Sequence, residues 1–279
     1  MLDAGAVTRT VVSHQPEVVI HLAARTDLQG RSLDDYAVNV RGVANVMDGI
    51  VAAGSVQRSI IASTRLVFDL GHVPRHERDY HASTLYGQSK ARAEEIVRDA
   101  PPALGIWTIV RPTGIWGPWF GAPFRQLFRM IERGWYVHPG QRTVRKSLGY
   151  VGNTVYQIQR LAIAPDTAVD RQTLWLTDYS PTVIRDWANL IQQTMGARRI
   201  RTAPIPLLMG AAIAGNAFER VGRRTAPLTT FRLNNMLADA LYPTDGLESI
   251  VGPLPNSVER GVALTVRWLR SEFGMPQGR

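Results

Sequence analysis

Three short apolar runs, separated by segments with a helical pattern, limit what this chain can fold into. They are "PEVVIHLAA" (16–24), "RSIIAST" (58–64) and "IWTIVRP" (106–112). Short runs rich in β-branched residues are typical of strands buried on both faces of a parallel sheet. The segments 32–54 and 86–98 between them carry apolar residues at helical spacing. This order predicts an α/β fold, an open, doubly wound parallel sheet with helices on both faces.

The pattern loosens in the second half of the chain. We expect helices at 123–134, 153–164 and 180–196, and a strand at 172–178. The helix at 180–196 has a proline in its first turn, which is a common start signal. The remaining C-terminal part is helix-rich with loops, so we predict a second, smaller and mostly helical lobe.

The composition excludes several kinds of site. The chain has 279 residues, of which 45% are hydrophobic, enough for one large domain or a domain with a smaller lobe. It has no cysteine, which excludes disulfides and thiolate metal sites and fits a reducing, cytoplasmic location. The six histidines are scattered, so we expect no metal site. The longest apolar run, 203–218, contains two prolines and is short for a membrane span, which predicts a core helix or a substrate lid.

The formal charge of +9 raises the question of nucleic acid as a partner. Arginines cluster in two places, at Arg198, Arg199 and Arg201 and at Arg220, Arg223 and Arg224. These clusters are short and lack interleaved aromatic residues. We therefore expect no nucleic-acid partner, and interpret the charge as a solvated basic face that helps attract a phosphorylated small substrate.

The stretch "LYGQSK" places Tyr86 and Lys90 four residues apart at the start of a predicted helix, so both side chains lie on one face. Ligands of open α/β sheets bind at the carboxyl ends of the strands. There "HLAA", "ST" and "RPTGIWGP" follow the three predicted strands, which brings Thr64 and Tyr86 to one crevice. A hydroxyl, a phenol and a lysine at such a place suit proton transfer to and from an alcohol or a carbonyl.

These motifs together resemble the extended short-chain dehydrogenase/reductases, the NAD-dependent epimerase/dehydratase family. The matching stretches are "VVIHLAA", "NVRGVANV", "STRLVF", "YGQSK", "RPTGIWGP", "KSLGYVGN" and "LWLTDYSPTVIRDWANLI". Their order is far more specific than any single motif, and they span nearly the whole chain. The resemblance implies a Rossmann-like domain, N-terminally incomplete, in residues 1–112 with contributions from about 146–178. Residues 113–145 and 179–279 would form the substrate lobe.

The resemblance also implies roles for individual residues. Tyr86 would exchange a proton with the substrate hydroxyl, Lys90 would lower the pKa of Tyr86 and bind the nicotinamide ribose, and Thr64 would hydrogen-bond the substrate oxygen. The implied contacts to NAD or NADP are Leu22, Ala23, Ala24, Asn39, Ser63, Tyr86, Lys90 and Thr113, and those to substrate are Thr64, Gly114 and Lys146. A helix-interior amide that bonds nearby backbone is the alternative for Asn39, and simple surface exposure is the alternative for Lys146.

One departure from the family concerns the cofactor. Relatives begin with a strand and a G-x-x-G-x-x-G turn, whose backbone approaches the pyrophosphate. Residues 1–279 contain no such pattern, since Gly42, Gly49 and Gly54 lie within or cap a predicted helix. Asp3 falls close to the position of an adenine-contacting aspartate. We therefore expect the chain to start just after the glycine-rich turn, to bind NAD(H) poorly, and to expose an apolar sheet edge at 18–22.

Two further departures concern the reaction. Sugar dehydratases of the family carry an Asp-Glu pair where this chain has Arg65 and Leu66, so water elimination is disfavoured. Gly114 replaces an asparagine that is common in nucleotide-sugar enzymes. We expect NAD(P)-dependent epimerisation or oxidoreduction of a sugar hydroxyl or ketone, most readily a nucleotide-linked one. Two alternatives stay open: dehydrogenation of a steroid-like or other lipid-like alcohol, and a truncated, non-catalytic binding or regulatory role. A homodimer through the helices at 32–54 and 86–98 is also expected.

Overall fold

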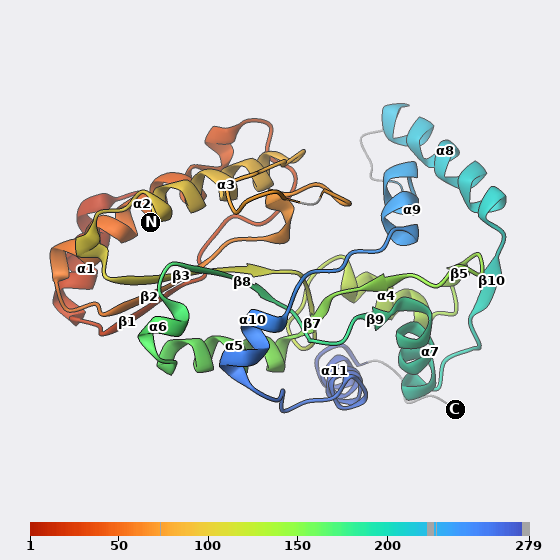
Figure 1. The fold of residues 1–279 in the computed structure, drawn as a ribbon. Coiled ribbons are helices and arrows are strands. Elements are labelled where there is room, and N and C mark those ends of the chain that lie inside the picture. Colours follow the sequence, from red (N-terminus) through yellow and green to blue (C-terminus); the bar gives the residue numbers. More distant parts are fainter. Residues whose placement is uncertain (73, 222–225, 227, 275–279) are drawn as a thin grey trace. The chain divides into compact units, whose positions relative to one another are not determined.

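The computed structural model describes residues 1–72, 74–221, 226 and 228–274, without the side chains of 220 and 221. Of the arginines noted above, Arg223 and Arg224 therefore lie outside the described residues. The chain divides into two compact units (Figure 1). The first comprises 1–114, 153–179 and 243–255, and the second comprises 115–152, 180–242 and 256–279. Each unit is described by itself below.

The first unit is built around a four-stranded parallel sheet. Its strands are β1 (Val18–His21), β2 (Arg58–Ala62), β3 (Ile106–Pro112) and β8 (Gln172–Leu176), in the spatial order β1-β2-β3-β8. Its helices are α1 (Ala4–His14), α2 (Ala37–Ala53), α3 (Leu85–Arg98), α5 (Val151–Ile163), α6 (Asp166–Val169) and α10 (Asp245–Val251), with 3-10 turns η1 (Leu33–Tyr36), η2 (Arg65–Val67) and η3 (Pro102–Leu104). The predicted α/β class with a parallel sheet is confirmed.

Both faces of this sheet are covered by helices, as Figure 1 shows. On one face, Ile61 and Ile109 of β2 and β3 pack with residues of α2 and α3, such as Val46 and Val97. On the other face, strand residues such as Val110 pack with α5, α6 and α10. Successive strand residues point to opposite faces, so a central strand buried on both sides reads as a continuous apolar run.

Strand β1 forms one edge of the sheet. Val19 packs on the α2 side. Val18 and Ile20, which point to the opposite face, are 38% and 43% exposed, and Leu22 just beyond the strand is 56% exposed. Among the described residues the apolar edge expected at 18–22 is therefore present.

The second unit contains short strands and several helices. They are β4 (Gly114–Trp116), α4 (Phe124–Glu132), β5 (Val137–Pro139), β6 (Arg145–Lys146), β7 (Leu148–Tyr150), β9 (Thr182–Val183), α7 (Ile184–Met195), β10 (Arg201–Ala203), α8 (Ile205–Val221), α9 (Thr230–Leu237) and α11 (Val258–Phe273). Its core is aromatic. The ring of Trp116 lies 5.2 Å from those of Tyr150 and Trp187, and the Phe128 ring lies 5.8 Å from that of Trp187.

Three features differ from expectation or were not anticipated. The helix predicted at 180–196 begins only at Ile184, because Thr182 and Val183 pair as β9 with β6. Helix α1 was not predicted; the Asp3 side chain caps it by accepting a hydrogen bond of 2.9 Å from the amide of Ala6. The run 203–218 is not a core helix, since Ala212 is the one buried residue among the described side chains of α8, 205–219.

The described part of the chain contains no cluster of three or more His, Asp or Glu residues able to hold a metal ion. None of its helices is both long and apolar enough to cross a bilayer.

Candidate functional site

The candidate site lies where β2 ends and α3 begins, within the first unit. The Thr84 hydroxyl caps α3 by accepting a 3.0 Å hydrogen bond from the amide of Gly87. This fixes the first turn of the helix, from which Tyr86 projects, and Lys90 follows one turn later on the same face. Both side chains are buried, with 8% of Tyr86 and 2% of Lys90 exposed.

The end of β2 reaches Tyr86 because one glycine allows a close approach. Thr64 follows the strand and starts the turn η2, where its hydroxyl accepts a 3.2 Å hydrogen bond from the Leu66 amide. A Cβ on Gly87 would lie 2.1 Å from the carbonyl oxygen of Leu66, so only glycine lets η2 sit against the first turn of α3. In this arrangement the Thr64 side chain hydrogen-bonds the Tyr86 phenol.

The shift in the pKa of Tyr86 has other causes than the expected one, the charge of Lys90. Burial raises the pKa of the Tyr86 phenol above its ordinary value, and the nearby Tyr36 raises it further. The hydrogen bond from Thr64 lowers the pKa of Tyr86, whereas Lys90 is not among the groups that shift it. Thr64 is therefore the group that offsets the burial of the phenol.

Lys90 is a buried cation. Burial lowers its pKa to about 8, and the negative charge of Glu94, one turn further along α3, raises it. Its ammonium group makes no hydrogen bond or ion pair with another described residue. A buried ammonium without such partners is energetically costly unless a bound group supplies them.

His21, which ends β1, is a second buried group that was not anticipated from the sequence. It is 6% exposed, and its Nε2 atom has no hydrogen-bond partner in the part of the chain that the structure describes. Burial, and secondarily the charge of Lys90, lower the pKa of His21 to about 4, so the imidazole is neutral at physiological pH. His21 and Lys90 thus couple electrostatically at the carboxyl end of β1.

The side chain of Asn39, on α2, hydrogen-bonds the backbone of the loop that follows β1. Its Oδ1 accepts a 2.8 Å hydrogen bond from the amide of Arg25, and its Nδ2 donates to the Arg25 carbonyl at 2.9 Å and to the Ser89 hydroxyl at 3.0 Å. The side chain is fully buried. This arrangement matches the alternative in which the amide bonds nearby backbone, and it makes Asn39 a residue that positions the loop carrying Ala23 and Ala24.

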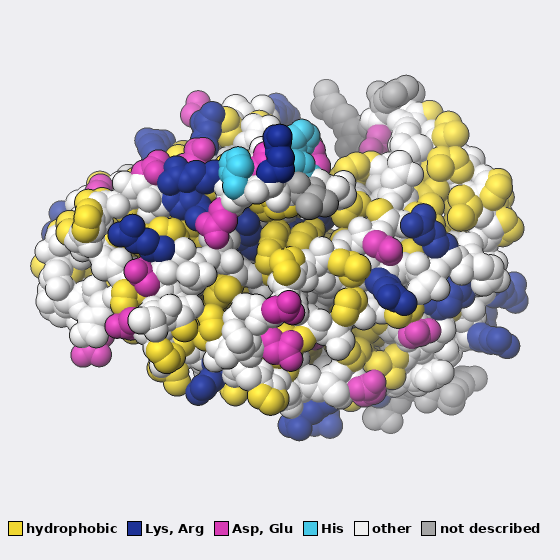
Figure 2. Space-filling view, viewed as in Figure 1, with side chains coloured by type: hydrophobic (Ala, Val, Ile, Leu, Met, Phe, Trp, Pro, Cys, Tyr) yellow, Lys and Arg dark blue, Asp and Glu magenta, His cyan; other side chains and the backbone are white. Residues whose placement is uncertain are grey.

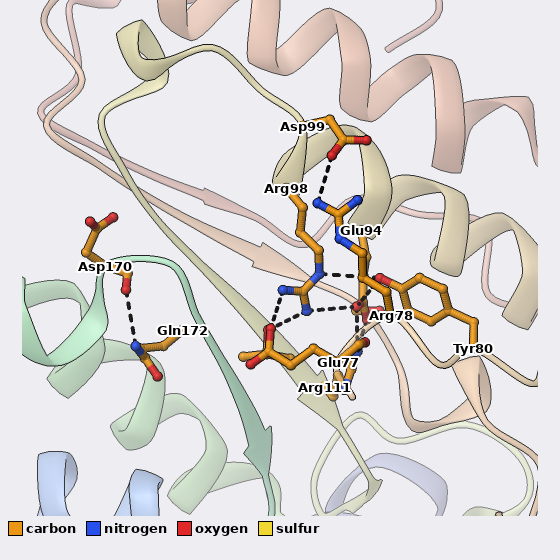
Figure 3. Close-up of polar contacts among 11 residues, drawn as sticks. Glu77, Arg78, Tyr80, Glu94, Arg98, Asp99, Arg111, Asp170 and Gln172 are labelled. Atoms are coloured by element: carbon orange, nitrogen blue, oxygen red, sulfur yellow. Dashed lines mark hydrogen bonds and ion pairs between the residues drawn. The ribbon is translucent and has the colours of Figure 1, made fainter. Parts of the chain in front are cut away.

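Ser63 belongs to a buried polar network that the sequence analysis missed, and Figure 3 shows its members Glu94 and Arg111. The Ser63 hydroxyl donates to Oε1 of Glu94 at 2.5 Å. Arg111 of β3 donates to both carboxylate oxygens of Glu94, from Nε at 2.9 Å and from Nη2 at 2.6 Å. Tyr80 donates to Oε2 at 3.0 Å, and Arg98 lies 3.5 Å from the same oxygen. Glu94 and Arg111 are 2% and 3% exposed.

The network continues to the surface and to the neighbouring strand. Arg98 pairs with Glu77 and donates a 2.6 Å hydrogen bond to the Thr173 hydroxyl on β8. The guanidinium of Arg111 also lies 4.8 Å from the centre of the Phe68 ring. A carboxylate four residues after Lys90 on the same helix face was the available signal for Glu94, but its partners are distant in sequence.

The remaining predicted site residues are distributed over both units. Leu22 and Ala23 are exposed beyond β1, where a flat ligand can approach the backbone. Thr113 follows β3, and its amide and hydroxyl both donate to the Leu176 carbonyl, at 3.1 and 3.3 Å. Gly114 is the last residue of the segment 1–114 of the first unit. Lys146 belongs to the second unit, where its Nζ donates a 2.6 Å hydrogen bond to the Asn235 carbonyl, so it is not a simple exposed residue.

The residues at this sheet edge fit the nicotinamide half of a dinucleotide. Such a cofactor requires a donor for its ribose hydroxyls and open backbone beside its ring. The ammonium of Lys90, which no described residue pairs, matches the first requirement, and the exposed residues Leu22 and Ala23 match the second.

Comparison with known proteins shows to which family the chain belongs. A sequence model of the NAD dependent epimerase/dehydratase family matches residues 1–170. The N-acetyl-alpha-D-glucosaminyl-diphospho-ditrans,octacis-undecaprenol 4-epimerase of Escherichia coli O157:H7 is 31% identical, over 95% of this chain and 81% of that protein. A 3 beta-hydroxysteroid dehydrogenase/Delta 5-->4-isomerase of Mycobacterium tuberculosis is 28% identical over 65% of this chain, but the match spans only 53% of that enzyme.

Solved structures show the same fold. The UDP-glucose 4-epimerase of Thermotoga maritima, solved with UDP-glucose, superposes with a TM-score of 0.69 at 18% identity, covering 97% of this chain and 82% of that one. The UDP-glucuronic acid 4-epimerase of Bacillus cereus, solved with UDP-glucuronic acid and NAD, gives a TM-score of 0.70 at 12% identity, covering 96% and 79%. The chain belongs to the NAD-dependent epimerase/dehydratase family.

Proposed function

We propose that this protein inverts the configuration of a sugar hydroxyl, on a sugar that is joined through a diphosphate to a larger carrier. The observation that carries the proposal is the contact between the Thr64 hydroxyl and the Tyr86 phenol, with the Lys90 cation one helical turn behind. A phenol hydrogen-bonded by a hydroxyl is suited to take a proton from an alcohol and to return it.

In this proposal each side chain has a distinct task. Tyr86 accepts the proton of the substrate hydroxyl as that carbon is oxidised to a ketone, and returns the proton when the ketone is reduced. Thr64 donates a hydrogen bond to the reacting oxygen, and Lys90 binds the ribose of the cofactor. A bound NAD(P) would supply reversible hydride transfer at the substrate carbon, and return of the hydride to the opposite face of the ketone would invert the centre with no net oxidation. Ser63 anchors the end of β2 beside Thr64, and Asn39 holds the loop after β1, where the cofactor would approach.

The proposal also concerns the group to which the sugar is linked, its carrier. By their names, the Escherichia coli relative and the two structural neighbours act on sugars linked to undecaprenyl diphosphate or to UDP. Both carriers present a diphosphate, which suits the excess of positive charge on this chain. The nucleotide expected from the sequence is therefore one of two carriers to be tested, and a polyprenyl diphosphate is the other.

The test is to supply the protein with NAD⁺ and either UDP-N-acetylglucosamine or N-acetylglucosamine linked to a polyprenyl diphosphate. Proton NMR of the released sugar then reports the configuration at carbon 4. We expect the 4-epimer to form with at least one carrier, without accumulation of NADH. Absence of the epimer with both carriers, or stoichiometric NADH, would contradict the proposal.

A second candidate is oxidation of a steroid-like or other lipid-like alcohol, favoured by the similarity to the mycobacterial enzyme. The same assay distinguishes the two, because an alcohol dehydrogenase accumulates NADH in proportion to its product. We also propose a homodimer that packs through α2 and α3, to be checked by light scattering.

A further inference from the structure

The surface of α8 is apolar to an unusual degree. From Ile205 to Phe218 the sequence contains no charged residue, and Asn216 is the one polar side chain. The exposed fractions of Leu207, Ile213 and Phe218 are 67%, 58% and 55%. Large exposed apolar patches on globular proteins mark surfaces that bind something.

The exposed side chains form a continuous face. Leu207, Ala211, Ala214 and Phe218 follow the 4-3-4 spacing that places residues on one side of a helix, and each of the four is exposed. The helix has 17 residues, which corresponds to a length of about 25 Å. Figure 2 shows hydrophobic side chains along the surface where Figure 1 places α8.

Helix α9 packs on the opposite side of α8 from this face and holds the helix in place. Asn216 donates a 2.8 Å hydrogen bond to the Thr230 hydroxyl and accepts one of 3.2 Å from the Thr230 amide, so its polar atoms face α9. A Cβ on Gly215 would lie 1.9 Å from the Leu228 carbonyl oxygen, so only glycine lets the connection to α9 come this close.

The charges beside α8 indicate the kind of partner. Arg198, Arg199 and Arg201 precede the helix and are all exposed. None of the three forms an ion pair with another described residue. Apolar side chains that insert among acyl chains, next to arginines that attract anionic headgroups, are the two elements of peripheral membrane binding.

We propose that the exposed face of α8 docks onto an anionic lipid bilayer, and that Arg198, Arg199 and Arg201 contact its headgroups. The helix would lie in the plane of the interface and would not cross the membrane, since no described helix qualifies as a span. The proposal does not depend on the proposed reaction, because it concerns a surface without catalytic residues.

The experiment is flotation of the full chain with vesicles of phosphatidylcholine alone or with about one third phosphatidylglycerol. We expect binding to the anionic vesicles that weakens with salt. The double variant Leu207→Gln/Phe218→Gln should lose at least about tenfold in affinity, because two apolar side chains no longer enter the bilayer. Arg198→Gln/Arg199→Gln should lose about fivefold per arginine, on anionic vesicles only.

A matched control is Ile163→Gln, which removes an equally exposed apolar side chain, 72% exposed, at the end of α5. It should bind vesicles like the parent. Circular dichroism and turnover of a soluble substrate verify that each variant is folded. The proposal is overturned if the parent does not bind anionic vesicles, or if the α8 double variant binds them as well as the parent does. It is equally overturned if light scattering shows that the double variant dissociates a dimer of the parent, because a second copy would then cover this face.

Discussion

Thr64 is the residue that adjusts the acid–base behaviour of Tyr86, because its hydrogen bond lowers a phenol pKa that burial raises. Thr64→Val keeps the shape of the side chain but removes the hydroxyl. The pKa of Tyr86 should therefore rise, the phenolate should become scarcer, and the acidic limb of the pH–rate profile should move to higher pH. Thr10→Val on the exposed α1 is the control. A profile of Thr64→Val that superimposes on the parent profile would remove this role.

Lys90 is expected to reduce stability while it serves function. Its pKa in the folded protein is about 8 and its ordinary value is 10.5, so at neutral pH the folded state holds a charge that burial disfavours. Between these two values the unfolded state binds the extra proton, and the stability of the parent rises with pH. Lys90→Met should therefore raise the free energy of unfolding at pH 7, by less near pH 9, while it lowers turnover.

Urea unfolding at the two pH values measures this difference for Lys90→Met. Arg92→Met, an exposed position on the same helix, is the control and should change little. If Lys90→Met were less stable than the parent at pH 7, the ammonium would have partners that stabilise it, and its assignment as a ligand-binding cation would be wrong.

At the scale of the elements, the contact between η2 and α3 depends on Gly87. In Gly87→Ala the new Cβ would meet the Leu66 carbonyl at 2.1 Å, so η2 and the attached Thr64 must move away from Tyr86. We expect stability to fall by about 1–3 kcal/mol and turnover to fall more than tenfold. Gly210→Ala, where a Cβ meets nothing within 4 Å, should be neutral or slightly stabilising. Equal behaviour of the two variants in unfolding and turnover assays would contradict this account.

The hydrogen bonds of Glu94 link three elements: the end of β2, helix α3 and strand β3. Glu94→Gln leaves the buried guanidinium of Arg111 without its charged partner, which typically costs about 3–5 kcal/mol. The change also removes the charge that raises the pKa of Lys90, so an alkaline limb of activity that follows Lys90 should move to lower pH.

Glu95→Gln is the matched control, because Glu95 is the exposed neighbour on α3. Unfolding curves and pH–rate profiles of the two variants should differ clearly. A Glu94→Gln protein as stable as the control, with an unshifted alkaline limb, would show that the network neither holds the site together nor supports Lys90.

The strands of the first unit could be predicted from the sequence because each is a continuous apolar run, as at 58–62 and 106–112. Elements that depend on distant partners could not. Strand β9 exists because Thr182 and Val183 pair with Arg145 and Lys146, so the predicted start of α7 was too early. Helix α1 was missed because its signal is one capping aspartate, Asp3, before a weakly patterned segment.

At the scale of the whole molecule, the sequence could indicate which residues come together at the site. It could not give the hydrogen bonds that each side chain makes there. An ordered set of motifs pointed to Tyr86, Lys90 and Thr64, and the structure brings Thr64 and Tyr86 together. The hydrogen bonds of Asn39 to the backbone of Arg25 could not be predicted, because they depend on how the loop after β1 folds. Glu94 was missed because its partners Ser63 and Arg111 lie on other strands and only folding brings them together.

The central claim is that Tyr86 transfers the proton in an NAD-dependent reaction on a sugar hydroxyl. The most direct measurement is the rate of product formation by Tyr86→Phe, compared with the parent at saturating NAD⁺ and sugar substrate, with unfolding curves to verify the fold. We predict a stable protein whose turnover is about 10²–10⁴-fold slower, as expected when a positioned acid–base group is lost. A folded Tyr86→Phe protein that turns over at nearly the parental rate would contradict the account.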